Sequence, residues 1–495
     1  MTRHDQRSRW LLAAAVAAGW GLLAGWWTPR SPLTTGEALW SIGISVAVGV
    51  AAGALVRSRW SLLTAPAVFA VVFELTRLGT DGPTVDGIAT TSFGVFAFAV
   101  GRGFHGLVSV LPMVVGAAVG AGWARRGGQV SPGHGWARYV RRSVAVLAAV
   151  GLVAFAVVLA RPASTEPITG SDGRPLAGSV AELITVPAGG RDLGMMIRGQ
   201  NTNNPVVLFL AGGPGGSERG AMRNHLPELE KYFTVATWDQ RGTGTSYPAL
   251  DPTSTYTLAS AVDDTITVTN YLRGRFGQDK IYLLGQSWGT ILGVLAVQQD
   301  PQLYTAYIGT GQMVDPLETD RIFYTDTLAW ARKGGNTTLT DELIAIGQPP
   351  YADMLNYETA LTHEQQVYPY DHTGNSEGAG GFSTNFIVPE YALIDQVHLL
   401  GSFMDTFAVL YPQLQDLDFR TSARTLPVPA YFVQGAHEAP GRAKPFQQWY
   451  AALSAPRKEL AVLATSGHRP LFEQPHQFVT FMTDTVLAQT AKAPR

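Results

Sequence analysis

The chain has 495 residues, which is too long for one ordinary domain, so two or three units are expected. A formal net charge of −2 gives no electrostatic reason to expect nucleic acid as a partner. The absence of cysteine excludes disulfides, a cysteine nucleophile and a thiolate metal site. Residues 1–160 are rich in Ala, Val, Leu, Gly and Trp and nearly free of acids, whereas residues 161–495 have the composition of a soluble domain.

Five apolar stretches in residues 1–160 approach the length needed to span a bilayer and predict a transmembrane region of about five helices. They are Trp10–Trp27, Ala38–Val56, Trp60–Leu75, Phe104–Trp123 and Ser143–Ala160. A signal peptide could explain the first stretch but not the series. Residues 88–100 are too short to span comfortably. They predict a re-entrant or interfacial piece, or the first part of a longer bent helix.

The arginines of this region predict its orientation, because basic residues gather on the cytoplasmic side. Three basic clusters would share that side after zero, two and four crossings: Arg3, Arg7 and Arg9; Arg57 and Arg59; Arg125, Arg126, Arg138, Arg141 and Arg142. We therefore expect a multi-pass protein of the cell membrane with a cytoplasmic N-terminus. Everything after residue 161 would lie outside the cytoplasm. We interpret the region as an anchor in the lipid bilayer.

Residues 161–178 form a Pro/Gly/Ser-rich linker, and short apolar strands alternate with helical segments after it. The expected strands are 180–186, 193–198, 205–210, 233–237, 281–284, 304–309, 428–434 and 459–463. This alternation predicts the α/β class, with a mostly parallel sheet covered by helices on both faces. The rhythm breaks at residues 315–396, which we interpret as a helical cap inserted between a first core part, 179–314, and a second, 397–490.

The strand ending at Leu284 runs into Gly285-Gln-Ser-Trp-Gly289, and an apolar helical pattern follows. A strand, a Gly-x-Ser-x-Gly turn and a helix are the context of a nucleophile elbow, which presents a strained serine at the top of a sheet. The two glycines fit because a Cβ at either position would clash where the flanking segments approach. The sequence therefore predicts Ser287 as a nucleophile.

Two further loops follow buried strands. The first, Ala211-Gly-Gly-Pro-Gly-Gly216, exposes backbone N–H groups. It lacks the lysine of a phosphate loop and the spacing of a dinucleotide fingerprint, so no cofactor is predicted. The second is Asp239-Gln-Arg-Gly-Thr-Gly-Thr-Ser246, and a late Gly467-His468 follows the last strand.

The order of these four motifs resembles the α/β-hydrolase fold and, within it, the proline iminopeptidase family. The resemblance covers roughly residues 180–490. It implies a Ser-His-acid triad in the chain order serine, acid, histidine. His468, in the loop before the final helix, is the expected base. Asp239 and Arg241 carry over as residues that brace loops near the site.

The acid departs from the family pattern. The family usually has aspartate in the loop after the penultimate strand, and here that slot holds Glu438. A glutamate can still orient the imidazole and stabilise its charged form. Asp315, after the strand that follows the elbow helix, is the alternative. The resemblance also implies an oxyanion hole from the backbone N–H groups of Trp288 and Gly213, although the loop begins with Ala211 where the family has histidine.

Serine at the elbow argues against dehalogenase or epoxide hydrolase chemistry, in which that position usually carries aspartate. The resemblance implies a peptidase that releases N-terminal residues through an acyl-enzyme, with acidic cap residues binding the substrate's free amine. The candidates for that role are Glu318, Glu358, Glu364, Glu377 and Glu390. A carboxylesterase or lipase acting on esters near the membrane would use the same triad. A non-catalytic binding module on the same fold is a third interpretation.

Overall fold

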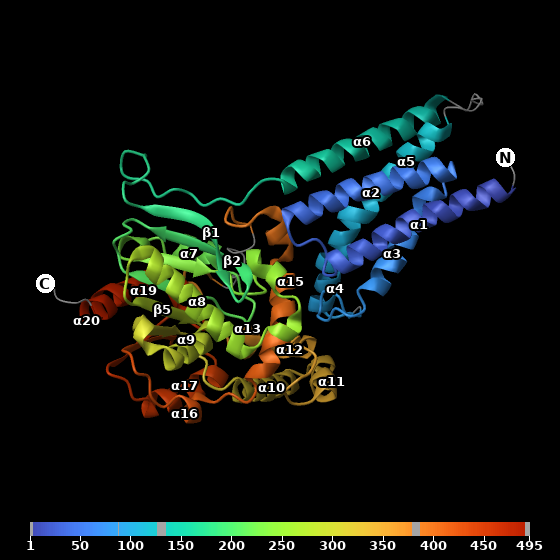
Figure 1. Ribbon diagram of the computed structural model, residues 1–495. Helices are drawn as coiled ribbons and strands as arrows, with labels where there is room; N and C mark the ends of the chain where they lie inside the picture. Colours follow the sequence, from blue (N-terminus) through green and yellow to red (C-terminus); the bar gives the residue numbers. More distant parts are fainter. Residues whose placement is uncertain (1–2, 88, 126–134, 379–386, 491–495) are drawn as a thin grey trace. The chain divides into compact units, whose positions relative to one another are not determined.

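The computed structural model describes residues 3–87, 89–125, 135–378 and 387–490 (Figure 1). The chain divides into two compact units. One comprises Met1–Pro162 together with Ala392–Gly401, and the other comprises Ala163–Tyr391 together with Ser402–Arg495.

The first unit is built from helices. They are α1 (Arg3–Trp27), α2 (Thr35–Val56), α3 (Ser61–Thr76), α4 (Ser92–Phe98), α5 (Leu111–Arg125) and α6 (Gly135–Leu159), with π-helical turns η1 (Ala99–Gly103) and η2 (Gly106–Val110) between α4 and α5. Four glycines bring α2 and α5 together, because a Cβ at any of them would clash with a backbone carbonyl oxygen of the facing helix. They are Gly49, Gly53, Gly116 and Gly120. Small residues at this spacing allow close packing of helices in membranes.

Within the described residues, four helical stretches are long and apolar enough to cross a membrane: His4–Trp27, Thr35–Val56, Ser92–Arg125 and Leu393–Leu414. The third and fifth predicted segments correspond to shorter apolar helices, Ser61–Thr76 and Ser143–Leu159. Ser92–Arg125 forms one helical stretch of 34 residues. From Ser92 onward, the short apolar stretch is therefore the first part of a longer helix, one of the two interpretations that the sequence left open.

The sequence pattern does not predict a span at Leu393–Leu414. From Ser402 on, this stretch belongs to the second unit. There Thr406 donates a hydrogen bond to the Gly242 carbonyl oxygen at 2.7 Å, and Tyr247 donates to Asp405 at 2.6 Å. Burial against protein therefore accounts for the apolar residues of this part.

The second unit contains an eight-stranded sheet. Its strands are β1 (Val180–Ala188), β2 (Arg191–Gly199), β3 (Val206–Leu210), β4 (Thr234–Trp238), β5 (Ile281–Gln286), β6 (Tyr304–Thr310), β7 (Ala430–Gly435) and β8 (Lys458–Leu463). The spatial order is β1-β2-β4-β3-β5-β6-β7-β8. Only the β1–β2 and β2–β4 pairs among these strands are antiparallel. The prediction of a mostly parallel sheet is confirmed.

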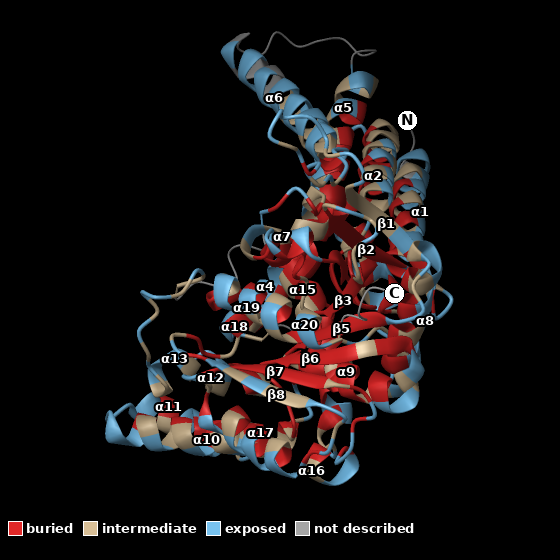
Figure 2. Cartoon of the chain, turned by 90° about the vertical axis from the view of Figure 1, so that its left-hand side faces the viewer, coloured by how far each residue is buried: buried red, intermediate tan, exposed pale blue. Residues whose placement is uncertain are grey.

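Helices cover both faces of this sheet, whose central strands are buried (Figure 2). On one face, Phe209 and Val433 pack in a core with residues of α7 (Arg219–His225) and α19 (Pro475–Phe481). On the other face, Phe432 contacts Trp449 of α17 (Pro440–Ala452). Helices α8 (Leu258–Phe276) and α9 (Trp288–Gln299) are the long connections that parallel strands require.

The segment between β6 and β7 is helical. It contains α10 (Pro316–Lys333), α11 (Thr337–Ile346), α12 (Leu355–Leu361), α13 (Glu364–Val367), α15 (Leu393–Leu410) and α16 (Phe419–Ser422), with a 3₁₀ turn η7 (Tyr411–Leu414). After β8 come α18 (Pro470–Glu473), α19, a π-helical turn η8 (Met482–Leu487) and α20 (Ala488–Thr490). Short 3₁₀ turns complete the unit: η3 (Leu229–Lys231), η4 (Gly244–Ala249), η5 (Thr253–Thr255) and η6 (Pro301–Leu303).

Candidate active site

Ser287 occupies a strained turn between β5 and α9. Its φ of 54° and ψ of −120° lie in a region that residues with a side chain rarely adopt. The two flanking positions must be glycine, because neither has room for a Cβ atom. A Cβ on Gly285 would clash with the Gly289 backbone, and a Cβ on Gly289 would clash with the carbonyl oxygens of Leu210 and Ala211. This is the geometry that the Gly-x-Ser-x-Gly pattern predicts.

His468 lies in the loop after β8 and reaches Ser287. Its Nε2 is 2.9 Å from the Ser287 Oγ. The loop is braced by Glu473, whose carboxylate accepts hydrogen bonds from the backbone N–H groups of Gly467 and Arg469, both at 2.9 Å. These two bonds fix the backbone on either side of the imidazole.

Glu438 follows β7 and contacts the other nitrogen of the imidazole. Its Oε2 is 2.6 Å from His468 Nδ1, and its side chain is 4% exposed. Its Oε1 accepts hydrogen bonds from the Ala439 N–H at 2.9 Å and the Arg442 Nε at 2.8 Å. Burial raises the pKa of this carboxyl, but the adjacent Arg442 and His468 together outweigh burial, and the resulting pKa is about 2. The carboxylate is therefore ionised at neutral pH.

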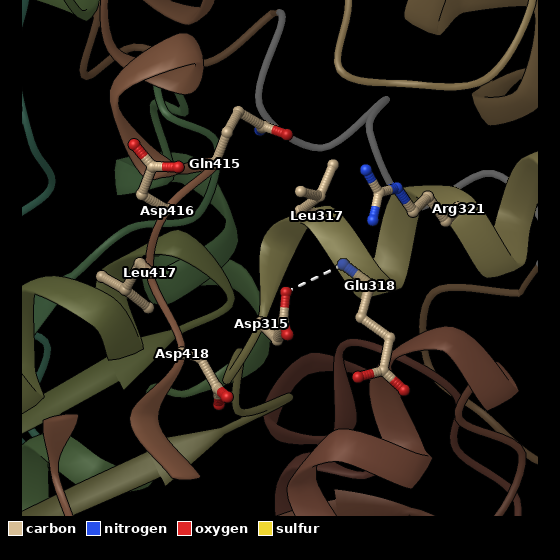
Figure 3. A pocket seen from close by; sticks show the side chains of 8 residues that line it. All are labelled: Asp315, Leu317, Glu318, Arg321, Gln415, Asp416, Leu417 and Asp418. Carbon is tan, nitrogen blue, oxygen red and sulfur yellow. Dashed lines mark hydrogen bonds between the residues drawn. The ribbon is translucent and has the colours of Figure 1, made fainter. Parts of the chain in front are cut away.

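Asp315, the alternative acid, has other partners. It caps the N-terminus of α10, where its Oδ1 accepts the Glu318 N–H at 2.8 Å, and its Oδ2 pairs with Arg420 at 2.6 Å. Figure 3 shows its carboxylate facing that N–H. Both residues line a pocket of about 380 Å³ between the first turns of α10 and the chain at 415–418. Burial raises the pKa of this carboxyl. Among the described residues, Glu438 and not Asp315 contacts His468.

The two predicted oxyanion donors belong to the segments that adjoin the nucleophile. Trp288 is the first residue of α9, so its N–H has no acceptor within the helix. Gly213 has a φ of 127°, and a Cβ on its neighbour Gly212 would lie 3.3 Å from the Ser287 Cβ. The glycine-rich loop therefore passes beside the serine.

A family model described as an alpha/beta hydrolase fold matches residues 205–475. The chain belongs to the α/β-hydrolase fold family. The probable aminopeptidase YbaC of Bacillus subtilis (strain 168) is 30% identical over 308 residues, which are 62% of this chain and 96% of YbaC. A probable proline iminopeptidase of Leptolyngbya boryana is 30% identical over 137 residues, which are 26% of this chain and 38% of that protein.

The chain also has a likeness to solved structures. The proline iminopeptidase-related protein TTHA1809 of Thermus thermophilus is 20% identical, with a TM-score of 0.44. The likeness covers 63% of this chain and 98% of that one.

The loop-bracing roles that the resemblance implied for Asp239 and Arg241 correspond to buried ion pairs in this hydrolase fold. Asp239 pairs with Arg219 at 2.9 Å and accepts a hydrogen bond from the Tyr391 hydroxyl at 2.8 Å. Arg241 pairs with Asp264 at 2.9 Å. These contacts fasten the loop after β4.

The five acidic residues considered for amine binding differ in their partners. Glu318 pairs with Arg420 at 2.7 Å, Glu364 with Arg442, and Glu390 with Arg223. Glu358 is buried at 7% exposure. Glu377 is 3% exposed and lies 3.3 Å from Arg469, the residue after His468.

Arg469 also pairs with Glu218 at 3.0 Å, and Glu218 accepts the Gly212 N–H at 3.3 Å. Glu377 is thus connected through one arginine to the loop beside Ser287. Burial raises the pKa of Glu377 to about 7, although Arg469 opposes the shift.

Sequence reasoning missed two residues that support the site. The Gln240 side chain accepts from the Trp288 indole at 2.8 Å and donates to the Ala211 carbonyl oxygen at 3.2 Å, which ties the two oxyanion segments together. Gln240 lies inside the loop motif after β4, so its position was the available signal. Arg442 lies in the first turn of α17, four residues after Glu438, and pairs with it at 2.8 Å. No group of three or more His, Asp or Glu side chains in the described part of the chain is suited to a metal ion.

Proposed function

We propose that the protein is a membrane-anchored serine hydrolase that releases N-terminal residues from peptides through an acyl-enzyme. The observation that carries this proposal is the unbroken series of contacts from the Ser287 Oγ through His468 to Glu438, on a strained elbow of the α/β-hydrolase fold. A serine, a base and an orienting carboxylate in this arrangement are recognised by their geometry.

In the proposed reaction, the Ser287 Oγ attacks the scissile carbonyl carbon while its proton passes to His468 Nε2. The N–H groups of Trp288 and Gly213 hold the oxygen that becomes negative. The C–N bond then breaks, and the leaving amine takes the proton from His468. Water, activated by the same imidazole, hydrolyses the acyl-serine. Glu438 holds the imidazole tautomer and stabilises the charged form.

The preference for peptides rests on the relatives, which are a probable aminopeptidase and probable proline iminopeptidases. An exopeptidase of this kind must bind a free α-ammonium group. Among the five acidic candidates, Glu377 suits this role best, because it is connected through Arg469 and Glu218 to the loop beside the nucleophile. Residues 315–396 would form the cap that carries it.

The membrane location rests on composition. Among the described helices of residues 1–160, three are long and apolar enough to span a bilayer. We propose this part as an anchor, joined by the linker 161–178 to a catalytic domain outside the cytoplasm, because the arginine clusters favour that orientation.

Turnover by the full-length chain in detergent micelles tests the function. Aminoacyl-naphthylamides and p-nitrophenyl esters should be compared side by side, with Ser287→Ala as the control. We expect amide turnover that disappears in Ser287→Ala. Turnover of esters alone would contradict the peptidase proposal and favour an esterase, and equal turnover in Ser287→Ala would contradict the nucleophile.

A further inference from the structure

Arg442 is a buried cation that touches the carboxylate behind His468. Its side chain is 7% exposed. Its Nε donates to Glu438 Oε1 at 2.8 Å, while its Nη atoms pair with the carboxylate of Glu364 on α13. The guanidinium also lies 4.9 Å from the centre of the Phe323 ring of α10. Three helices, α10, α13 and α17, therefore enclose it.

This arrangement divides the two oxygens of Glu438 between two partners. Oε1 is held by Arg442 and by the Ala439 N–H, which leaves Oε2 for His468 Nδ1 at 2.6 Å. A glutamate has one more rotatable bond than an aspartate, so its carboxylate needs more restraint to point at one nitrogen. A guanidinium restrains it well, because its donors lie in a rigid plane and cannot lose their charge.

We infer that Arg442 is a positioning residue for the triad, and this inference rests on the proposed function. It fixes the Glu438 carboxylate so that Oε2 faces His468, and Glu364 of α13 fixes Arg442 in turn. The segment between β6 and β7 thereby contributes to the alignment of the catalytic histidine. Arg442 acts through Glu438 and does not touch the reacting atoms.

The ionisable groups around Glu438 determine how removal of Arg442 would change the pH dependence of kcat/KM. His468, Arg442 and Tyr370 interact with the Glu438 carboxylate, and Glu364 and Asp320 interact with Arg442. Burial disfavours the ionised carboxylate, and Arg442 is the largest opposing influence. Without Arg442 the pKa of Glu438 rises, so the active ionised form is lost at a higher pH than in the wild type.

The test uses the full-length chain with Arg442→Met, Arg442→Lys and Arg420→Met. Arg420 is the matched control, because it binds Asp315, Asp418 and Glu318 in the same unit without contacting the triad. We expect kcat of Arg442→Met to fall about 10- to 100-fold, less than the roughly 10⁴-fold loss when a triad carboxylate is disabled. KM should change less than about twofold, because positioning acts on the transition state.

The acid limb of the kcat/KM profile should move to higher pH in Arg442→Met and stay near the wild-type position in Arg442→Lys, which keeps the charge. Arg420→Met should leave kcat and the profile unchanged. Wild-type kcat and pH profile in Arg442→Met, with only a lower melting temperature, would overturn the inference. If Arg442→Met does not fold, an Arg442→Lys variant with unchanged kcat would overturn it, because a compact ammonium cannot reproduce the guanidinium's planar set of donors.

A second readout needs no turnover. The proton between His468 Nδ1 and Glu438 should give a low-field proton resonance that Arg442→Met removes or shifts and Arg420→Met retains. A resonance unaffected by Arg442→Met would contradict the positioning role even if the wild type hydrolysed none of the substrates. Failure of the proposed function alone would instead appear as an inactive wild type in which the resonance still depends on Arg442.

Discussion

Three side chains from distant parts of the chain meet at one point: Ser287 after β5, Glu438 after β7 and His468 after β8. Each follows the carboxyl end of a parallel strand, and these ends lie at the same edge of the sheet. The positive φ of Ser287 persists because the surrounding backbone leaves no room for another path. The sequence left open which carboxylate orients the imidazole, that of Glu438 or that of Asp315.

Replacement of Glu438 by Gln should show whether this residue is the acid that orients the imidazole. The amide keeps the shape but cannot stabilise the imidazolium, so we expect kcat to fall by about 10³- to 10⁴-fold. The matched control is Asp315→Asn, which can still cap α10 and should retain most of the activity. Steady-state kinetics on both variants provide the measurement. Near-normal kcat in Glu438→Gln with a large loss in Asp315→Asn would move the acid to Asp315.

The pH dependence of kcat/KM provides a second test of the role of Glu438. The pKa of Glu438 is lowered to about 2, so this carboxylate stays ionised above about pH 4. For a substrate with a blocked amine, which does not need Glu377, the acid side of the kcat/KM profile should then report a single group, the base that must be neutral to accept the serine proton. We expect a limiting slope of one between pH 4 and neutrality. A slope of two in that range would mean that a second group, such as Glu438, also loses its active form.

At the scale of elements, the sequence predicted every strand of the described sheet, because each is a short apolar segment bounded by turn residues, and a continuous apolar run such as 205–210 marks a buried parallel strand. The long helix α8 has Thr257 as its N-cap and Gly277 as its C-cap. The helical segment after the glycine-rich loop is broken: α7 ends at His225, and a separate turn begins at Leu229. Pro227 explains the break, because it lacks an N–H and restricts the residue before it.

The elbow's crowding can be tested by Gly289→Ala. The added Cβ would meet the backbone oxygens of Leu210 and Ala211, which cannot move independently of β3. We expect a loss of stability of about 3 kcal/mol or more and loss of activity. Gly274→Ala is the control, because Gly274 lies in α8 with no atom within 4 Å of its Cβ position, and alanine there should stabilise by about 0.5–1 kcal/mol. Similar unfolding temperatures for the two variants would contradict the steric account.

The proposed amine site can be tested by Glu377→Gln. Loss of the negative charge should raise KM for aminoacyl substrates with a free amine about tenfold, and should leave substrates with a blocked amine unaffected. Because the pKa of Glu377 is raised to about 7, KM of the wild type should also increase as pH falls below 7. Glu318→Gln is the matched control. Equal KM values for wild type and Glu377→Gln would exclude this role.

At the scale of the whole molecule, composition alone separated an apolar N-terminal part from a soluble part. The structure forms two compact units, and Ala392–Gly401 groups with the N-terminal one. The sequence could not predict that, because the apolar face of α15 has the same composition whichever protein surface it covers. Arg442 was missed for a related reason: its partner Glu364 is 78 residues away, and only the fold brings them together.

The orientation of the whole chain can be tested with protease added to intact cells. The linker 161–178 is predicted to lie outside the cytoplasm, so cleavage there should release the catalytic part without lysis. A protease site placed in the N-terminal residues before Arg9 should stay protected and serves as the internal control. Full protection of the linker until lysis would contradict the proposed topology.

Covalent labelling with a fluorophosphonate probe tests the central claim most directly, because the probe reacts with a serine activated by a neighbouring base. Peptide mapping of the labelled full-length chain should find one adduct, on Ser287. The adduct should be absent from Ser287→Ala and form much more slowly in Glu438→Gln. No labelling of the folded wild type, or labelling that persists in Ser287→Ala, would contradict the assignment of this site.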